Sequence, residues 1–539
     1  MAAAASEGLV VSADLEMDMP PCGGLQPCRK RALESPDLEF DMAPESSPLS
    51  PGPTSAMGVF GWAHQFLELL SVRGKNLFGV DLSQEVRNFM MTGITLCTEY
   101  SGMGGPEACM QEITQATNTP AECVVCHHAS DIEPTCRQVL LAHHQSGCSP
   151  GCVFGDILER CEAHKVQKLQ WLAARLRANA AAATERGMPK PKAMRKYGAE
   201  FLQRADQLMW SDVQQIQQRG RSFKQAHCYR HDQHCAVYPL RRGNASIILM
   251  IAGITCTAWS SMGKEDGWLG PSAIAFVVFI REVLLNSPDC VILENTANFD
   301  VAGLAPLQSM YTILVLKFSP TLLGVPATRM RKYMVLIKRC KLQWRPELER
   351  FGLQIAFQKL FERKIMIGAV DLLRASKEDV QAYKNTFLQR SHLPALRASG
   401  REWSFFQSLP GGMRGMIRNH EACAAQTEKA EPTEQTGRKA LIATIGQSPA
   451  RNPPRECCPA LLRKTKLWSL LDRRLCLPGE HLELMGYNIY GPGAVSFAEE
   501  LISMKPQAQV ELAGNGMHAC AIGSVLLFLL CGVIERPVE

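Results

Sequence analysis

The cysteine at position 256 is the residue with the clearest capacity for chemistry. It follows an apolar run in the segment Gly253-Ile254-Thr255-Cys256. A partly ionised thiol is a strong nucleophile, and nearby positive charge favours its ionisation. Glu294, Arg329 and Arg331 follow along the chain, and they offer a carboxyl that can share a proton with a ligand and fixed positive charge beside a thiolate. This set predicts covalent catalysis by a thiol, with a buried core cysteine and a solvated arginine pair as the alternatives.

A glycine-rich turn lies upstream, between a β-prone run at 94–98 and a helix expected from Pro106. Glycines let the backbone approach a ligand closely. The turn lacks the basic ending of a P-loop, so it is not expected to cradle phosphate. The residues expected to face a ligand here are Tyr100, Ser101, Gly102, Gly104 and Gly105.

Two acidic residues follow the next two strand-like runs. Asp131, next to Ile132, comes after 124–126, and Asp156, next to Ile157, comes after 153–154. In doubly wound nucleotide-binding folds, an acid past the second strand accepts the ribose hydroxyls, and a second acid can accept from the adenine amine. Helix N-capping is the alternative for each acid. We favour cofactor binding because both acids stand at strand ends in this order.

The elements that must position these residues alternate between strand and helix. A helix is expected at 133–144, and further strands are expected at 246–251, 291–293 and 333–337. This alternation predicts an α/β fold with a doubly wound, mostly parallel sheet. Two strongly helical, basic pieces, at 166–183 and 199–218, interrupt the series.

In this order the motifs resemble those of the cytosine-5 DNA methyltransferase family. Glu294-Asn295 resembles its Glu-Asn pair, 324–331 resembles its Gly-Val-Pro segment with two arginines, and Gly514-Asn515 resembles its final motif. The match covers roughly 92–160, 244–340 and 471–539. The resemblance implies a class I methyltransferase, Rossmann-like fold, S-adenosyl-L-methionine as cofactor, and a smaller target-recognition domain.

The resemblance also implies a reaction, which is methyl transfer to carbon 5 of cytosine in DNA through a covalent Cys256 adduct on a flipped base. Thr255 and Asn515 would border the cofactor. Thr255 stands where the family usually has proline, and Ala327 stands where it has glutamine, which puts the rate in doubt. The alternatives are an RNA (tRNA) cytosine-5 methyltransferase and a catalytically weak, methyltransferase-like DNA-binding or scaffold protein.

The chain divides into six expected segments. These are a disordered N-terminal tail at 1–57, the cofactor-binding half of the methyltransferase domain at 58–160, a basic helical insertion at 161–243, the catalytic half at 244–340, a target-recognition region at 341–470, and a return to the methyltransferase domain at 471–539. Basic residues between Lys341 and Arg474, including the run at 463–466, are expected to meet phosphates of double-stranded DNA.

Composition limits the class of protein. The chain has 539 residues, a net charge of +6 and 46% hydrophobic residues, which is ordinary for a globular protein. Its 21 scattered cysteines favour a reducing compartment, and the basic run at 28–31 is a weak nuclear-targeting candidate. The apolar stretch at 519–534 is shorter than the roughly 18–20 residues of a membrane span, so we expect a buried core helix and no membrane association. The oligomeric state is not specified.

A compact group of histidines and cysteines lies in the insertion. Its spacing is plausible but irregular for zinc, so we favour a basic surface at a helix end without a metal, with a zinc site as the alternative. The group consists of His227, Cys228, His231, His234 and Cys235. The histidine pairs at 127–128 and 143–144 are expected on helix surfaces.

Overall fold

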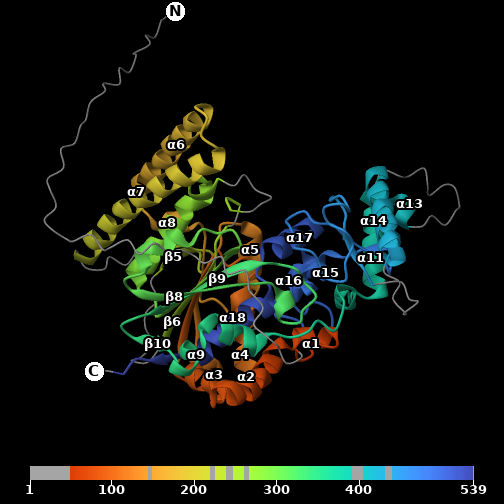
Figure 1. Cartoon of the computed structure of the whole chain (residues 1–539), viewed down its shortest axis with the longest axis horizontal. Coiled ribbons are helices and arrows are strands. Elements are labelled where there is room, and N and C mark those ends of the chain that lie inside the picture. Colours follow the sequence, from red (N-terminus) through yellow and green to blue (C-terminus); the bar gives the residue numbers. More distant parts are fainter. Residues whose placement is uncertain are drawn as a thin grey trace, which may run out of the picture. The chain divides into compact units, whose positions relative to one another are not determined.

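The centre of the molecule is a nine-stranded sheet (Figure 1). The computed structural model describes residues 49–143, 148–218, 225–237, 247–255, 257–259, 266–390, 405–430 and 440–537. Within these residues the strand order is β5-β4-β3-β2-β1-β6-β7-β9-β8. The strands are β1 Ile94–Glu99, β2 Val124–Ser130, β3 Cys152–Phe154, β4 Gln225–Cys228, β5 Gln233–Ala236, β6 Ile247–Gly253, β7 Cys290–Thr296, β8 Tyr311–Phe318 and β9 Arg331–Lys338.

The sheet is mostly parallel, and its strand order reverses direction at one point. Strands β3, β2, β1, β6 and β7 are parallel neighbours, whereas β9 runs antiparallel between β7 and β8. The hairpin β4–β5 extends the β3 edge in antiparallel fashion. From β1 the chain builds outward to β3, and then returns to β6 on the other side of β1. This arrangement confirms the expected doubly wound, Rossmann-like fold. Its topological switch point lies at the carboxyl ends of the paired strands β1 and β6.

Side chains of alternate strand residues enter two different cores, as the strand period requires. Leu96 of β1 packs in the first core and Cys97 in the second. The helices that contribute to the first core are α1 Ala56–Phe60, α2 Trp62–Phe78, α3 Leu82–Met91, α4 Gly105–Thr117, α5 Pro134–Ala142, α9 Pro346–Phe351, α10 Leu353–Phe361, α15 Pro478–Glu483, α16 Ala498–Ser503, α17 Pro506–Asn515 and α18 Ala519–Gly532.

The second core lies under the basic insertion. Its helices are α6 Ala163–Glu185, α7 Lys190–Gln218 and α8 Pro271–Asn286, with short 3-10 turns η2 Ile157–Arg160, η3 Gly267–Leu269 and η4 Val301–Leu307. Figure 1 shows α6 and α7 side by side as one helical hairpin. Their apolar residues cover α8, so the insertion forms part of the main fold.

Helix α18 is the most apolar element of the first core, and all fourteen of its residues are buried. The span Pro506–Gly532 is long and apolar enough to cross a membrane, but 89% of its most apolar window is buried inside the protein. The sequence-based expectation of a core helix is therefore confirmed.

A third, smaller core contains α11 Lys377–Arg390, α13 Phe405–Ser408, α14 Gly411–Ala430 and the three-stranded sheet of β11 Ile442–Thr444, β12 Leu467–Ser469 and β13 Arg474–Leu475. The expected target-recognition region began at 341, but α9 and α10 pack in the first core. Strand β10 Leu342–Trp344 pairs with β14 Val533–Glu535. The separate small core thus begins near 377.

The predicted boundary of the disordered tail, at residue 57, lies too far along the chain. Residues 1–48, including the basic run at 28–31, lie outside the described residues. Beyond them, Gly52 N donates to Lys364 O at 2.8 Å, Lys364 N donates to Ser50 O at 2.9 Å, and α1 begins at Ala56. Disorder as far as residue 57 is therefore wrong for 49–57, because this strip pairs with the backbone near residue 364.

Candidate functional site

The glycine turn lies at the carboxyl end of β1, beside the switch point. Tyr100, Gly102 and Gly104 have φ values of 52°, 59° and 84°. A side chain placed at Gly102 would meet no atom within 4 Å, so the turn is open there. A Cβ at Gly104, by contrast, would come within 2.5 Å of the His143 ring. Packing against His143 therefore requires glycine at position 104, whereas Gly102 presents uncovered backbone.

Asp131 braces this turn. Its Oδ2 accepts from the backbone N–H of Gly102 at 2.9 Å, and its Oδ1 accepts from Glu133 N at 2.9 Å. The N-cap of α5 is Glu133, so helix capping is not the role of Asp131. Burial raises the pKa of its carboxyl. A carboxylate has capacity for about four hydrogen bonds, so Asp131 can still accept from a ligand, and the neighbouring Ile132 is 58% exposed.

Asp156 serves as an N-cap. Its Oδ1 accepts from Leu158 N at 3.0 Å at the start of η2. The capping alternative is thus realised for Asp156, although capping uses only part of its acceptor capacity. Ile157 is buried in the second core. Asp131 and Asp156 therefore both lie at the carboxyl ends of parallel strands, as the sequence predicts.

A buried ionic group beneath the turn was not anticipated. Glu99, the last residue of β1, forms an ion pair with Arg160 and accepts from His128 Nε2 at 2.9 Å. Burial alone would raise the pKa of Glu99, but Arg160 and His128 lower it to about 2. His128 and its neighbour His127 lie on β2, so their expected position on a helix surface is wrong.

His143 also differs from expectation. It is buried at the end of α5, its Nε2 lies 3.1 Å from Met103 O, and it stacks on Phe497. A helix-surface position is therefore wrong for His143, whose ring supports the glycine turn from behind; His144 lies outside the described residues.

Two glycines, one at the start of α4 and one at the end of β6, mark close approaches to the last part of the chain. A Cβ at Gly105 would lie 2.4 Å from the Tyr487 hydroxyl, and a Cβ at Gly253 would lie 2.8 Å from Met517 Cε. Tyr487 itself donates to Met517 O at 2.8 Å. The same Cβ at Gly253 would lie 3.4 Å from Tyr100 O, so the ends of β1 and β6 meet at the switch point.

Glu294 and Arg331 form an ion pair between β7 and β9. Glu294 is in β7 and pairs in register with Gly253 of β6, whereas Arg331 begins the antiparallel strand β9. Arg331 Nε lies 2.9 Å from Glu294 Oε1. This oxygen is buried, and among the described residues no donor is aligned for a hydrogen bond to it. It retains acceptor capacity toward a ligand.

The neighbouring Asn295 holds the loop that follows β6. Its Nδ2 donates to Ile254 O at 3.2 Å, and its Oδ1 accepts from Thr296 N at 2.8 Å. Thr255 is exposed. Cys256 lies outside the described residues, so its position stays a prediction, but the backbone two residues before it is tied to the strand that carries Glu294.

Arg329 makes different contacts from Arg331. It is 5% exposed, and it donates to Gly516 O at 2.7 Å, Gly514 O at 3.2 Å and Leu461 O at 3.3 Å. The bonds to Gly514 and Gly516 hold the turn at the end of α17, where Asn515 is exposed. The two arginines were expected to act together. In the structure Arg331 contacts the Glu294 carboxyl group, whereas Arg329 contacts the turn at the end of α17.

A groove of about 720 Å³ lies away from the glycine turn, between α14 and α17. Lys464 and Lys466 line it together with Gln507 and Glu511. Arg463 is exposed beside it, 3.5 Å from Glu511 and 4.0 Å from Glu133. The basic run at 463–466 therefore lies between the small core and the start of α5.

Comparison with known proteins gives likenesses of fold alone. No family model and no curated protein matches the sequence. Among solved structures, the S. pombe Dnmt2 methyltransferase is 12% identical with a TM-score of 0.38, and a putative DNA modification methyltransferase encoded within an E. coli prophage is 11% identical with a TM-score of 0.39. Each alignment covers 81% of this chain and 98% of the other. At these values, assignment to a family depends on the residues of the site.

Proposed function

We propose that this protein is an S-adenosyl-L-methionine-dependent methyltransferase that acts on carbon 5 of cytosine in nucleic acid. The observation that carries the proposal is the buried Glu294 Oε1, which is paired with Arg331, accepts no hydrogen bond from the residues that the structure describes, and is adjacent to the loop leading to Cys256. A carboxyl in this position could bind N3 and the exocyclic amine of a flipped cytosine. Drawing electrons from the ring eases thiolate addition.

The residues around the glycine turn fit the proposed cofactor. The open face at Gly102 leaves room for a ligand against bare backbone, and two carboxylates stand at neighbouring strand ends. Tyr100, Ser101, Gly102, Gly104 and Gly105 would border the methionine moiety, Asp131 with Ile132 the ribose, and Asp156 with Ile157 the adenine. Thr255 and Asn515 would close the site. When bound, the cofactor supplies an electrophilic methyl group on a sulfonium.

The chain's own groups account for the remaining chemistry. The Cys256 thiolate adds to carbon 6 of cytosine, which makes carbon 5 nucleophilic. After carbon 5 is methylated, it loses its proton to a base, the double bond reforms, and the thiolate leaves carbon 6. Glu294 holds the ring, Arg331 holds the Glu294 side chain through their ion pair, and Asn295 orients the loop before the nucleophile.

A covalent trap tests this proposal. In duplexes containing 5-fluorocytosine, carbon 5 carries fluorine in place of the proton that must leave. Incubation with labelled cofactor should therefore leave a stable protein–DNA adduct. The adduct should be absent in Cys256→Ser and retained in Cys340→Ser, because Cys340 is exposed on a turn outside the site. Absence of an adduct on both DNA and RNA would refute the proposal and favour a catalytically weak scaffold.

We propose double-stranded DNA as the substrate, following the resemblance, with transfer RNA as the alternative. The lysines of the groove between α14 and α17 are suited to phosphate contact. Methyl transfer onto genomic DNA and onto total transfer RNA should be compared at equal nucleotide concentration. Label on RNA alone would reverse the choice.

A nuclear location is proposed from the basic run at 28–31, and a fluorescent fusion lacking that run tests it.

A further inference from the structure

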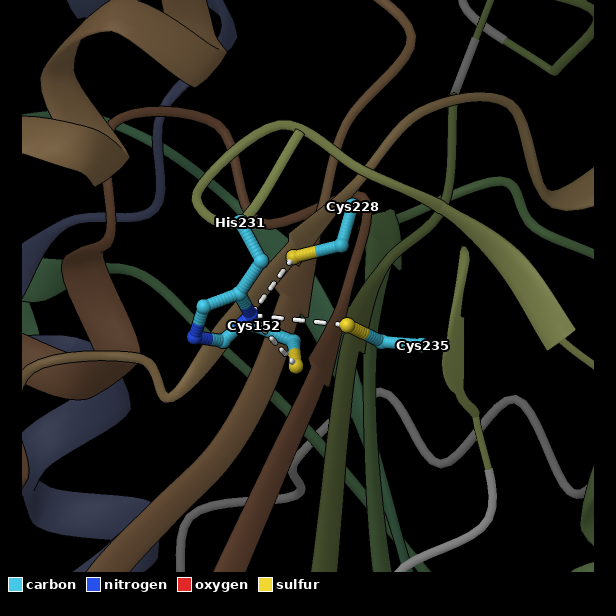
Figure 2. A group of neighbouring side chains, drawn as sticks. All are labelled: Cys152, Cys228, His231 and Cys235. Atoms are coloured by element: carbon cyan, nitrogen blue, oxygen red, sulfur yellow. Dashed lines mark hydrogen bonds between the residues drawn. The ribbon is translucent and has the colours of Figure 1, made fainter. Parts of the chain in front are cut away.

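The edge of the central sheet carries a second site that the proposed reaction does not use. Cys152 of β3, Cys228 at the end of β4, His231 in the following turn and Cys235 of β5 converge there (Figure 2). The interpretation of 227–235 as the surface end of a basic helix is wrong, because these residues form the β4–β5 hairpin. Three sulfurs and one imidazole nitrogen face one another, and all four atoms lie within 4.8 Å of one another.

The separations match those of a tetrahedral metal centre. His231 Nδ1 lies 3.4 Å from Cys228 Sγ, 3.4 Å from Cys235 Sγ and 3.7 Å from Cys152 Sγ (Figure 2). A tetrahedral Zn²⁺ with Zn–S bonds of about 2.3 Å and a Zn–N bond of about 2.0 Å separates its nitrogen and sulfur ligands by about 3.5 Å. The cluster therefore has the size that one zinc ion requires.

The ligand set is that of a structural site. Three cysteines and one histidine fill four tetrahedral positions and leave no open position for water or substrate. Sulfur-rich tetrahedral coordination favours zinc over magnesium, calcium or manganese, which prefer oxygen ligands. We propose that Cys152, Cys228, His231 and Cys235 bind one structural zinc ion.

The local structure around Cys228 supports thiolate ligation. The backbone amides of Val153, His231 and Arg230 hydrogen bond to the Cys228 sulfur. Amide hydrogen bonds to a sulfur stabilise its ionised form, which is the form that binds metal.

The hairpin has few other means of attachment. Among the described residues, one register pair joins β3 to β4, Phe154 with Cys228, and Tyr229 N donates to Val153 O at 2.8 Å. The buried core beneath consists of Phe154, Ala226, Cys228 and Val237. An isolated two-stranded hairpin is marginal in water. A metal that links β3, the turn and β5 would fasten the hairpin to the sheet.

This attachment bears on the proposed cofactor site. The turn between β4 and β5 carries Tyr229, whose ring would lie 3.2 Å from a Cβ at Gly155, the residue before Asp156. The Arg137 guanidinium lies 4.2 Å from the centre of the same ring and donates to Asp131 O at 2.9 Å. If the proposed function holds, zinc positions Tyr229, and through it the segments of both acidic residues.

Metal analysis of the full-length protein tests the inference directly. Inductively coupled plasma mass spectrometry of protein purified without an affinity metal should find one zinc per chain. His231→Ala should lower the zinc content well below this value, whereas His234→Ala should retain it. The two histidines are exposed in the same hairpin, and only His231 joins the cluster, so the pair separates ligation from surface effects.

Cobalt substitution of the wild-type protein avoids variants that fail to fold. Tetrahedral cobalt bound by three thiolates should give intense thiolate-to-metal absorption, and this band should disappear when zinc is added. Absence of zinc from the wild-type protein would overturn the inference. Full retention of zinc by His231→Ala would also overturn it.

Cofactor binding then separates this inference from the proposed function. S-adenosyl-L-methionine titrations should show binding weakened several-fold in His231→Ala and unchanged in His234→Ala. Zinc in a protein that does not bind the cofactor would refute the proposed function and leave the metal site standing. Cofactor binding by a wild-type protein that lacks zinc would refute the metal site alone.

Discussion

At the scale of single residues, the role proposed for the carboxyl of Glu294 gives the most direct prediction about activity. Its Oε1 is buried and lies 2.9 Å from Arg331 Nε. Glu294→Gln removes a proton-sharing group but keeps the side-chain size, so methyl transfer should slow by about 10²- to 10⁴-fold. Cofactor affinity should stay within twofold or so of wild type.

Single-turnover methyl transfer and cofactor titration measure these two effects. Arg331→Lys should fall between Glu294→Gln and wild type, because lysine keeps the charge but loses the planar guanidinium. Glu349→Gln on the exposed side of α9 is the control. Equal rates for Glu294→Gln and Glu349→Gln would remove Glu294 from the mechanism.

Glu107 makes the stability of the fold depend on pH. It is fully buried in the first turn of α4 behind the glycine turn, and burial raises its pKa from 4.5 to about 7. The folded protein therefore keeps a proton that the unfolded chain releases above about pH 4.5. The stabilisation is complete below this pH and is lost as pH rises through about 7.

Glu107→Gln should flatten this dependence. Glutamine is neutral at every pH, so the variant should exceed wild type in free energy of unfolding above pH 7 by on the order of 3 kcal/mol. Urea unfolding at pH 5 and pH 8 measures the difference. Identical pH dependence in the two proteins would show that Glu107 does not ionise in this range.

The candidate site was predictable in part from the order of its residues. Asp131, Glu294 and Arg331 could be found because each follows or begins a recognisable strand. The role of Arg329 could not, because its acceptors at Leu461, Gly514 and Gly516 are more than 130 residues away. The fourth metal ligand was missed for the same reason, since Cys152 and His231 are 79 residues apart.

At the scale of secondary-structure elements, buried strands were predictable and partly exposed strands were not. Strands β6 and β7 are continuous apolar runs, which parallel strands covered on both faces require. Strand β8 was not anticipated, because its burial alternates irregularly and Lys317 lies within it. The β4–β5 hairpin was also missed, since its residues are mostly polar and its small core comes from contact with β3.

The last turn of α17 should be intolerant of any side chain at Gly514. A Cβ there would lie 2.4 Å from the carbonyl carbon of Leu462, which is backbone and cannot rotate away. Gly514→Ala should therefore lower the free energy of unfolding by about 1–3 kcal/mol. It should also weaken the hydrogen bonds from Arg329.

Gly412→Ala provides the matched control in α14, because a Cβ there meets no atom within 4 Å. That change should be neutral or stabilise by up to about 1 kcal/mol, since alanine is the better helix former. Thermal unfolding of both variants measures the contrast. Equal melting temperatures for the two would mean that the segment at 462–463 shifts to make room.

At the scale of the whole molecule, the basic insertion is joined to the fold by buried charge as well as by apolar contact. Asp212 of α7 accepts from Arg281 Nε of α8 at 2.5 Å and forms an ion pair with Lys165 of α6. Burial would raise the pKa of Asp212, but Lys165 and Arg281 lower it. Three helices therefore share one carboxylate.

Asp212→Asn should destabilise the fold by about 1–3 kcal/mol, because Arg281 loses one charged hydrogen-bond acceptor in the interior but keeps its ion pair with Glu282. Asp206→Asn on the same helix is the control, since burial raises the pKa of Asp206 to about 7 and its ionised form is disfavoured. Urea unfolding and limited proteolysis within 163–218 measure the effect. Comparable stability of the two variants would show that solvent reaches Arg281.

The packing of α18 against α2 governs when the protein can complete its core. A Cβ at Gly523 would lie 2.2 Å from the Trp62 ring, and Cys520 donates to the backbone of Val59, 461 residues away in the sequence. During synthesis, the apolar faces of α1 and α2 stay uncovered until residues 519–532 emerge from the ribosome. Until then they are exposed to misassociation, so we expect the nascent chain to depend on chaperones.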